Sequence, residues 1–113
     1  MYSFTVNDTK ARMEKACGLY SNITKTAGES GTIWEMYANF WNNRHKVTVI
    51  RTADKVYRYS TDNGNFECAI EGDRITLTAG EYFGRKCRSE RTLKKFKATS
   101  MLLFSLVKCG KLK

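Results

Sequence analysis

The middle of the chain, from residue 47 to residue 78, alternates apolar and polar side chains with a period of two. This period is typical of strands that bury one face. Turn-forming residues interrupt it at Ala53-Asp54-Lys55, Asp62-Asn63-Gly64-Asn65 and Glu71-Gly72-Asp73. Because connections this short join antiparallel neighbours, we predict a four-stranded antiparallel meander. Its expected strands are residues 47–52, 56–60, 66–70 and 74–78.

The residues before this meander show the three- and four-residue spacing of a helix. Asn7 and Asp8 can cap a helix that reaches about Lys25. Its expected buried face consists of Met13, Ala16, Cys17, Tyr20 and Ile23. Ahead of it, Tyr2, Phe4 and Val6 alternate with polar residues, which is typical of a short strand.

Residues 32–41 fit two interpretations. Thr32-x-x-Glu35 has the form of a capping box, and Ile33, Met36, Tyr37, Phe40 and Trp41 would share one helical face. The same segment also alternates as a strand would, through Trp34, Met36, Ala38 and Phe40. We favour an aromatic-rich second helix and keep the strand as the alternative.

The last part of the chain predicts a long helix, which Ser89 can cap and which runs to about Lys108, closed by Gly110. Beyond Ala98 most of its circumference is apolar, so that half must be covered by the sheet or by a partner. The predicted fold is one α+β domain, residues 1–113. It is a four-stranded antiparallel meander with an N-terminal helix, an aromatic-rich second helix and a basic C-terminal helix packed on one face.

Charge is distributed unevenly along this domain. The 113 residues carry 20 Lys+Arg against 11 Asp+Glu, a formal net charge of +9. Residues 1–84 hold equal numbers of cations and carboxylates, so they form a charge-neutral body. Residues 85–113 hold the remaining cations with Glu90 as their one carboxylate. The whole net charge therefore belongs to the C-terminal helix segment.

Such a single-signed segment favours contact with a polyanion, because lysine and arginine neutralise phosphates and release their counterions. The expected phosphate-contacting residues are Arg85, Lys86, Arg88, Arg91, Lys94, Lys95 and Lys97. Tyr57 and Tyr59 share one face of a predicted strand and Arg58 lies on the other. If exposed, the tyrosines could stack on unpaired bases, and the alternative is that they cap the core.

Catalytic signals are sparse. The chain has no Walker-type or dinucleotide-type glycine loop, no GxSxG and no HExxH. His45, the one histidine, is the one candidate general base. Glu67, Glu71 and Asp73 surround one hairpin but match no recognised magnesium site, and carboxylates are also usual at a solvated turn. We expect no metal and no cofactor, and favour a binding protein over an enzyme.

The four cysteines, Cys17, Cys68, Cys87 and Cys109, form no CxxC pair. This spacing predicts reduced thiols in a cytoplasmic protein, with Cys17 and Cys68 in the core. The first residues lack the basic and apolar pattern of a secretory signal, and the longest apolar stretch, Met101 to Val107, is too short to span a bilayer.

Taken together, the sequence predicts a small non-enzymatic protein that binds DNA or RNA through its basic C-terminal helix. The alternative is a small inhibitor or regulator that docks on an acidic protein, with Trp34, Tyr37 and Trp41 as anchors. An anionic membrane surface is the least favoured partner. Sequence preference and oligomeric state stay open.

Overall fold

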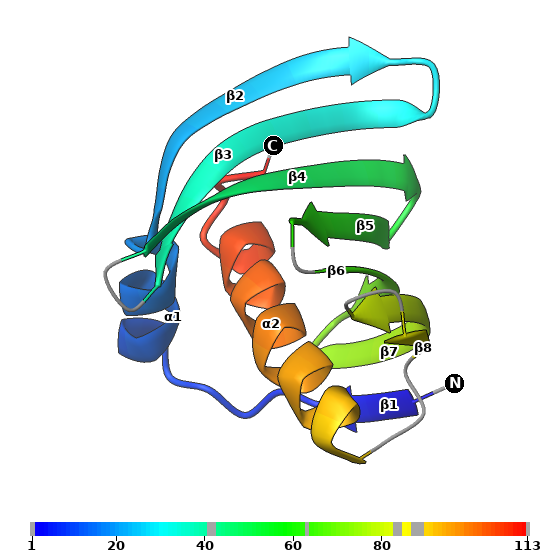
Figure 1. Cartoon of the computed structure of the whole chain (residues 1–113). Helices are drawn as coiled ribbons and strands as arrows, with labels where there is room; N and C mark the ends of the chain where they lie inside the picture. Colours follow the sequence, from blue (N-terminus) through cyan, green and yellow to red (C-terminus); the bar gives the residue numbers. More distant parts are fainter. Residues whose placement is uncertain (1, 41–42, 63, 83–84, 87–89, 113) are drawn as a thin grey trace.

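A computed structural model describes residues 2–40, 43–62, 64–82, 85–86 and 90–112. Within these ranges one strongly curved antiparallel sheet wraps around the C-terminal helix, and the N-terminal helix packs beside that helix (Figure 1). The elements are β1 (Tyr2–Thr5), α1 (Lys10–Cys17), β2 (Tyr20–Gly28), β3 (Gly31–Phe40), β4 (Asn43–Ala53), β5 (Val56–Thr61), β6 (Gly64–Glu71), β7 (Arg74–Tyr82), β8 (Arg85–Lys86) and α2 (Glu90–Lys108).

The strands lie in the order β1-β7-β6-β5-β4-β3-β2. Strands β2 to β7 follow one another as a meander, and β1 returns antiparallel to β7, with Tyr2 opposite Leu77. The two-residue β8 pairs with the far end of β7. The sheet accounts for 57% of the chain, in seven strands along its main path and with two helices. The prediction of a four-stranded meander with three helices is therefore wrong, although all four predicted strands lie within β4 to β7.

The first error concerns the N-terminal helix, which ends at Cys17 instead of reaching Lys25. Thr9, and neither Asn7 nor Asp8, is its N-cap, and the Thr9 side chain accepts a hydrogen bond from the Arg12 N–H at 3.2 Å. Beyond Gly18 the chain enters β2, which pairs with β3. Tyr20 therefore reaches the core from a strand, because pairing with β3 outweighs the continued helical spacing.

The second error concerns residues 32–41, where the structure has strand β3 and no helix through residue 40. The strand alternation wins because Trp34, Met36 and Ala38 are all buried on the face toward the helices. Glu35 caps no helix; its carboxylate lies 3.3 Å from Lys46 Nζ on neighbouring β4. Trp41 lies outside the described residues.

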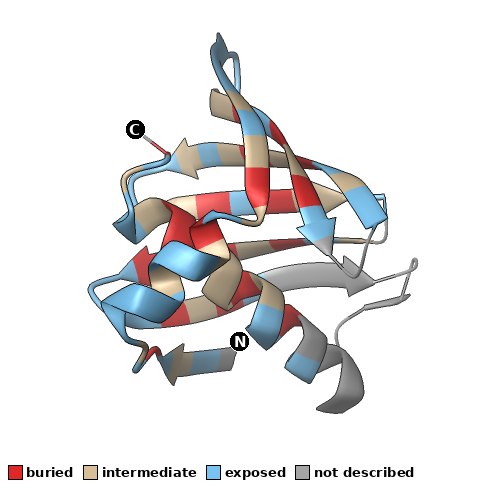
Figure 2. Ribbon diagram, turned by 90° about the vertical axis from the view of Figure 1, so that its left-hand side faces the viewer, coloured by how far each residue is buried: buried red, intermediate tan, exposed pale blue. Residues whose placement is uncertain are grey.

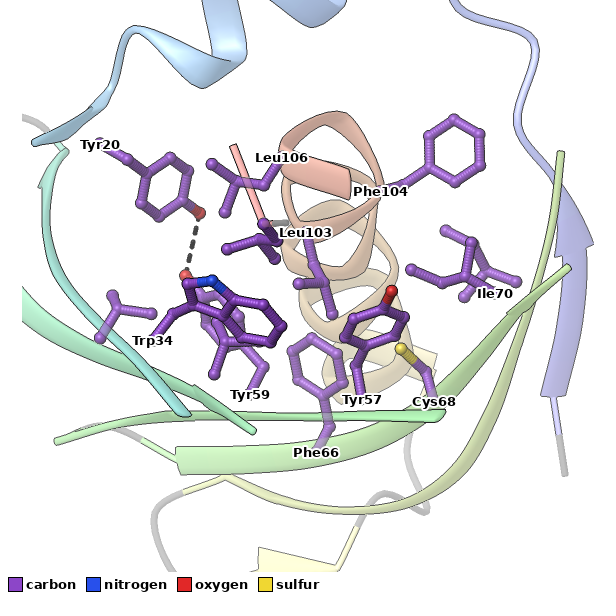
Figure 3. Packing of buried hydrophobic residues seen from close by; sticks show 14 of the residues in the cluster. Tyr20, Trp34, Tyr57, Tyr59, Phe66, Cys68, Ile70, Leu103, Phe104 and Leu106 are labelled. Carbon is purple, nitrogen blue, oxygen red and sulfur yellow. Dashed lines mark hydrogen bonds between the residues drawn. The ribbon is translucent and has the colours of Figure 1, made fainter. Parts of the chain in front are cut away.

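The core fills the space between the concave face of the sheet and α2. Tyr59 stacks on Phe66 with ring centroids 5.1 Å apart, and Phe66 meets the edge of Phe96 from α2 at 5.6 Å. Leu103 and Leu106 of α2 are fully buried above these rings (Figure 3). Figure 2 shows the buried residues gathered between the sheet and the helices.

The C-terminal half of α2 is buried on its outer side as well, because α1 packs there (Figure 1). The Cys17 thiol of α1 donates to the Ser105 carbonyl oxygen of α2 at 3.1 Å, and Ser105 is 3% exposed. The hydroxyls of Ser100 and Ser105 donate to carbonyls of Lys97 and Met101 within α2, which satisfies them in the core. The expectation that this half needs a cover is confirmed, and the sheet and α1 provide it.

A Schellman motif ends α2. Gly110 has φ 76°, its N–H donates to the Val107 carbonyl, and the Lys111 N–H donates to the Leu106 carbonyl. The turn directs Leu112 back into the core, where it is 7% exposed. Neither α2 nor α1, as far as their residues are described, has the length and apolar character needed to cross a membrane.

Gly31, at the start of β3, permits the close approach of β4. Its φ is +132°, and a Cβ there would overlap the Arg51 carbonyl oxygen. Gly72, in the turn between β6 and β7, also has a positive φ of +60° but has nothing within 4 Å of a built Cβ. A side chain at Gly72 would therefore meet backbone strain alone, whereas one at Gly31 would meet both strain and steric overlap.

We predict that Gly31→Ala lowers the free energy of unfolding by at least about 2 kcal/mol, because strain and a backbone clash add. Gly72→Ala, which introduces strain alone, should cost about 1 kcal/mol. Urea denaturation followed by circular dichroism measures both. Equal losses in the two variants would contradict the steric role of Gly31.

Candidate functional site

The sheet layer, defined as residues 20–78, is electrically balanced. It holds seven Lys and Arg and seven Asp and Glu. Most of its charges pair with one another, in Lys46–Glu35 (3.3 Å), Arg51–Asp54 (3.0 Å), Lys55–Glu71 (3.6 Å) and Arg58–Glu67 (3.4 Å). These exposed pairs each stabilise the fold by less than about 1 kcal/mol, but they leave little net field on this side of the molecule.

The helix layer, defined as residues 6–18 of the α1 segment and the described side chains of residues 94–112, is strongly basic. Seven cations lie here against two carboxylates, Asp8 and Glu14. Arg12 pairs with Asp8 at 3.9 Å, and the other six cations of this layer are lysines. They are Lys10, Lys15, Lys94, Lys97, Lys108 and Lys111, and all six are exposed. We call these six residues the lysine surface.

Two members of the lysine surface lie one helical turn apart, where α2 emerges from beneath α1. Lys94 and Lys97 are exposed, while Phe96 between them is 4% exposed and faces the sheet. The Lys97 ammonium is 5.2 Å from the centre of the Phe4 ring, and at the other end of α2 Lys108 is 5.3 Å from that of Phe104. No described carboxylate lies within ion-pair distance of Lys94 or Lys97, nor of Lys108 or Lys111. The ring faces beside Lys97 and Lys108 attract their ammonium groups without neutralising them.

The structure places only part of the predicted basic segment. Lys94 and Lys97 are exposed on α2 as expected. Arg91 and Lys95 belong to α2, and Arg85 and Lys86 form β8, but their side chains are not among those described, and Arg88 lies outside the described residues. Sequence reasoning missed Lys10 and Lys15, because it counted α1 with the neutral body. Their position on the outer side of α2 depends on the fold and has no local sequence signal.

The tyrosine pair proposed for base stacking lies in the core. Tyr57 is 7% exposed and Tyr59 1% exposed, so neither offers a free ring face. The Tyr59 hydroxyl hydrogen bonds to that of Tyr20 at 3.0 Å (Figure 3), and burial raises the pKa of Tyr59 to about 12. Arg58 points to the opposite face, where it binds Glu67. The alternation was correct, but the tyrosine face is the buried one.

The expected partner anchors are also displaced from the surface. Trp34 is 3% exposed and packs beside Tyr59 under α2 (Figure 3). Tyr37 is half-buried, and the Arg44 guanidinium lies 3.9 Å above its ring. Trp41 lies outside the described residues. The tryptophan for which the structure gives a position is a core residue and is not an exposed anchor.

The catalytic and metal candidates are occupied by local contacts. His45 lies on β4 with Nδ1 3.5 Å from an Asp62 carboxylate oxygen. Glu67 is held by Arg58 and accepts from the Thr78 hydroxyl at 3.2 Å, and Glu71 faces Lys55. In the described part of the chain no three His, Cys, Asp or Glu side chains gather as metal ligands would. The contacts given for these residues are ones that stabilise strands and turns.

Comparison with known proteins gives no match: no protein-family model, no curated protein and no solved structure is similar to this chain. Charge and burial of individual side chains are the observations that bear on function. The clearest of these observations is the difference in net charge between the balanced sheet layer and the basic helix layer.

We predict that Trp34→Ala lowers the free energy of unfolding by about 3–5 kcal/mol, because it opens a cavity under α2. Tyr37→Ala, at a half-buried position of the same strand, should cost markedly less. Urea titrations of the two variants measure the difference. Wild-type stability of the Trp34→Ala protein would contradict the assignment of Trp34 to the core.

Proposed function

We propose that the protein binds nucleic acid, DNA or RNA, by placing the lysine surface against phosphates. The observation that carries this proposal is the separation of charge between the two layers. The sheet layer neutralises itself through its own ion pairs, whereas Lys94, Lys97, Lys108 and Lys111 have no described carboxylate in reach. A protein that needed charge only for solubility would mix both signs over its surface.

Unpaired lysines gain more from a polyanion than paired ones do. Each phosphate that a lysine neutralises releases condensed counterions, and the favourable entropy of that release drives binding. Lys46 or Arg58 would first have to leave Glu35 or Glu67, which offsets the gain. Binding is therefore expected on the helix layer and weak on the sheet layer.

Nucleic acid fits this surface better than an acidic protein does. Protein interfaces are centred on buried aromatic anchors, with charges at the rim. The described exposed residues of α1 and α2 include no aromatic side chain, and Trp34 is in the core. Tyr57 and Tyr59 are also buried, so they cannot stack on bases. The lysines would contact phosphates, and we therefore expect little sequence preference.

A cytoplasmic location is part of this proposal, because nucleic acid is present there and the described cysteines, Cys17, Cys68 and Cys109, are free thiols. The protein is proposed to act without catalysis, as a binding module.

The test is a salt titration of binding to a short DNA duplex and to a single-stranded RNA, followed by fluorescence anisotropy. For the wild type we expect a log–log slope of affinity against salt of about −4 to −6. The double variant Lys94→Gln, Lys97→Gln removes two phosphate contacts and should reduce that slope by about 2 on the duplex.

The matched control is the double variant Lys46→Gln, Arg58→Gln, which removes the same charge from the sheet layer. Its slope should equal that of the wild type. Equal losses in the two double variants would show that net charge alone attracts the ligand and would contradict the lysine surface. Absence of binding to both nucleic acids at low salt sinks the proposal, and tighter binding to polyglutamate than to either would favour an acidic protein partner.

A further inference from the structure

Two cysteines from opposite ends of the sequence lie side by side where α1 meets the end of α2. Cys17 is the last residue of α1 and is 3% exposed. Cys109 follows the last residue of α2 and is exposed to solvent. Figure 1 shows the α1 helix beside the C-terminal half of α2. The Cys109 thiol lies close enough to Cys17 to raise the pKa of the Cys17 thiol.

One carbonyl oxygen fixes both cysteines. The Ser105 carbonyl accepts the Cys17 thiol at 3.1 Å and the Cys109 N–H at 2.9 Å. Because the two hydrogen bonds share this oxygen, the Cys17 sulfur lies at most about 6 Å from the Cys109 nitrogen. The two thiols also contact each other, and this contact raises the pKa of Cys17. Cys17 and Cys109 are therefore neighbours through both a shared carbonyl oxygen and their own side chains, as two cysteines that form a disulfide must be.

Both cysteines are held by helix ends and not by free loops. Cys109 precedes Gly110, whose positive φ and Schellman hydrogen bonds set the direction of the chain. Cys17 precedes Gly18, whose N–H donates to carbonyls of the last turn of α1. The effective concentration of one thiol at the other is therefore set by the folded state and is high.

We propose that Cys17 and Cys109 are a redox pair that is oxidised to an intramolecular disulfide, which joins α1 to the C-terminal end of α2. The oxidant is a small-molecule disulfide such as oxidised glutathione. The proposal does not require nucleic-acid binding, although Lys108 and Lys111 of the lysine surface flank Cys109.

The reaction proceeds by two thiol–disulfide exchanges. The exposed Cys109 thiolate attacks the oxidised reagent, its sulfur forms a mixed disulfide, and one reagent thiolate leaves. Cys17 then loses its proton and attacks the Cys109 sulfur, the new protein disulfide forms, and the second reagent thiolate leaves. The protons of the two cysteine thiols end on the two reagent thiols, and the two electrons taken from the cysteines reduce the reagent.

The two thiols have different roles because their surroundings differ. Burial raises the pKa of the Cys17 thiol to about 12, and the adjacent Cys109 adds to the rise, while Lys111 opposes it. Cys17 is therefore a slow first nucleophile and acts as the resolving thiol, so the second exchange should speed up with increasing pH. Cys68 is fully buried on β6, where burial raises its pKa to about 12 as well, and it is out of reach of reagents in solution.

The experiment uses the full chain with Cys87→Ser, so that the thiols of known position remain. The folded protein is equilibrated with reduced and oxidised glutathione, quenched with acid, and mapped by mass spectrometry. We expect a loss of roughly 2 Da and a single cross-linked peptide pair containing Cys17 and Cys109. Adding Cys109→Ser, an exposed and conservative change, should abolish that product and leave the fold intact.

A second measurement compares the folded chain with the chain in urea. The equilibrium constant for disulfide formation against glutathione should be roughly 100-fold larger in the folded protein, and the oxidised protein should melt about 10 °C higher than the reduced one. The gain is large because the bond closes a long loop that contains β2 to β8 and α2.

Three results would overturn the proposal. One is a glutathione adduct on Cys109 that persists as the end product. Another is a disulfide that includes Cys68 or links two chains. The last is an equilibrium constant that is no larger in the folded protein than in urea.

Discussion

The burial of α2 inside the curve of the sheet is the interaction on which the rest of the structure depends. Phe96, Leu103 and Leu106 supply apolar cover to a concave face lined by Tyr59 and Phe66, and each such side chain contributes about 1.5–3 kcal/mol when fully buried. The same helix offers its outer side to α1, so the position of α1 depends on it as well. The sheet packs on one side of α2, and α1 covers part of the other side. The charged residues of both helices therefore face solvent, and the lysine surface results from this packing.

The sequence predicts those parts of the fold whose signals are local. The strands within β4 to β7 were correctly placed, because period-two alternation and short polar turns coincide there, and the extent of α2 followed from its helical spacing and Gly110. Residues 32–41 could not be decided in the same way, because Met36 and Phe40 fit a helical face and a strand face equally well. The outcome depends on β2 and β4 lying on either side, and this is tertiary information.

The candidate site was predictable to a similar degree. A count of charges along the chain identifies the basic C-terminal segment, and the exposed Lys94 and Lys97 agree with it. The same count misses Lys10 and Lys15, because within residues 1–84 Asp8, Glu14 and Glu81 cancel the charges of Lys10, Arg12 and Lys15. Alternation also placed Tyr57 and Tyr59 on one face of the sheet, but a period of two says only that two faces differ. Which face is buried was decided by α2, far away in the sequence.

The place of α2 in the chain order has a consequence for how the protein folds. The concave face is complete only when β1 has paired with β7 across most of the sequence and α2, which follows every strand, has packed beneath it. Contacts of such long sequence separation slow folding, since the entropy of closing large loops must be lost before they form. A nascent chain that has already formed the meander presents an apolar inner face, with Trp34 and Tyr59 uncovered, until the residues of α2 leave the ribosome. We expect this interval to be when the chain is most prone to aggregate and most in need of a chaperone.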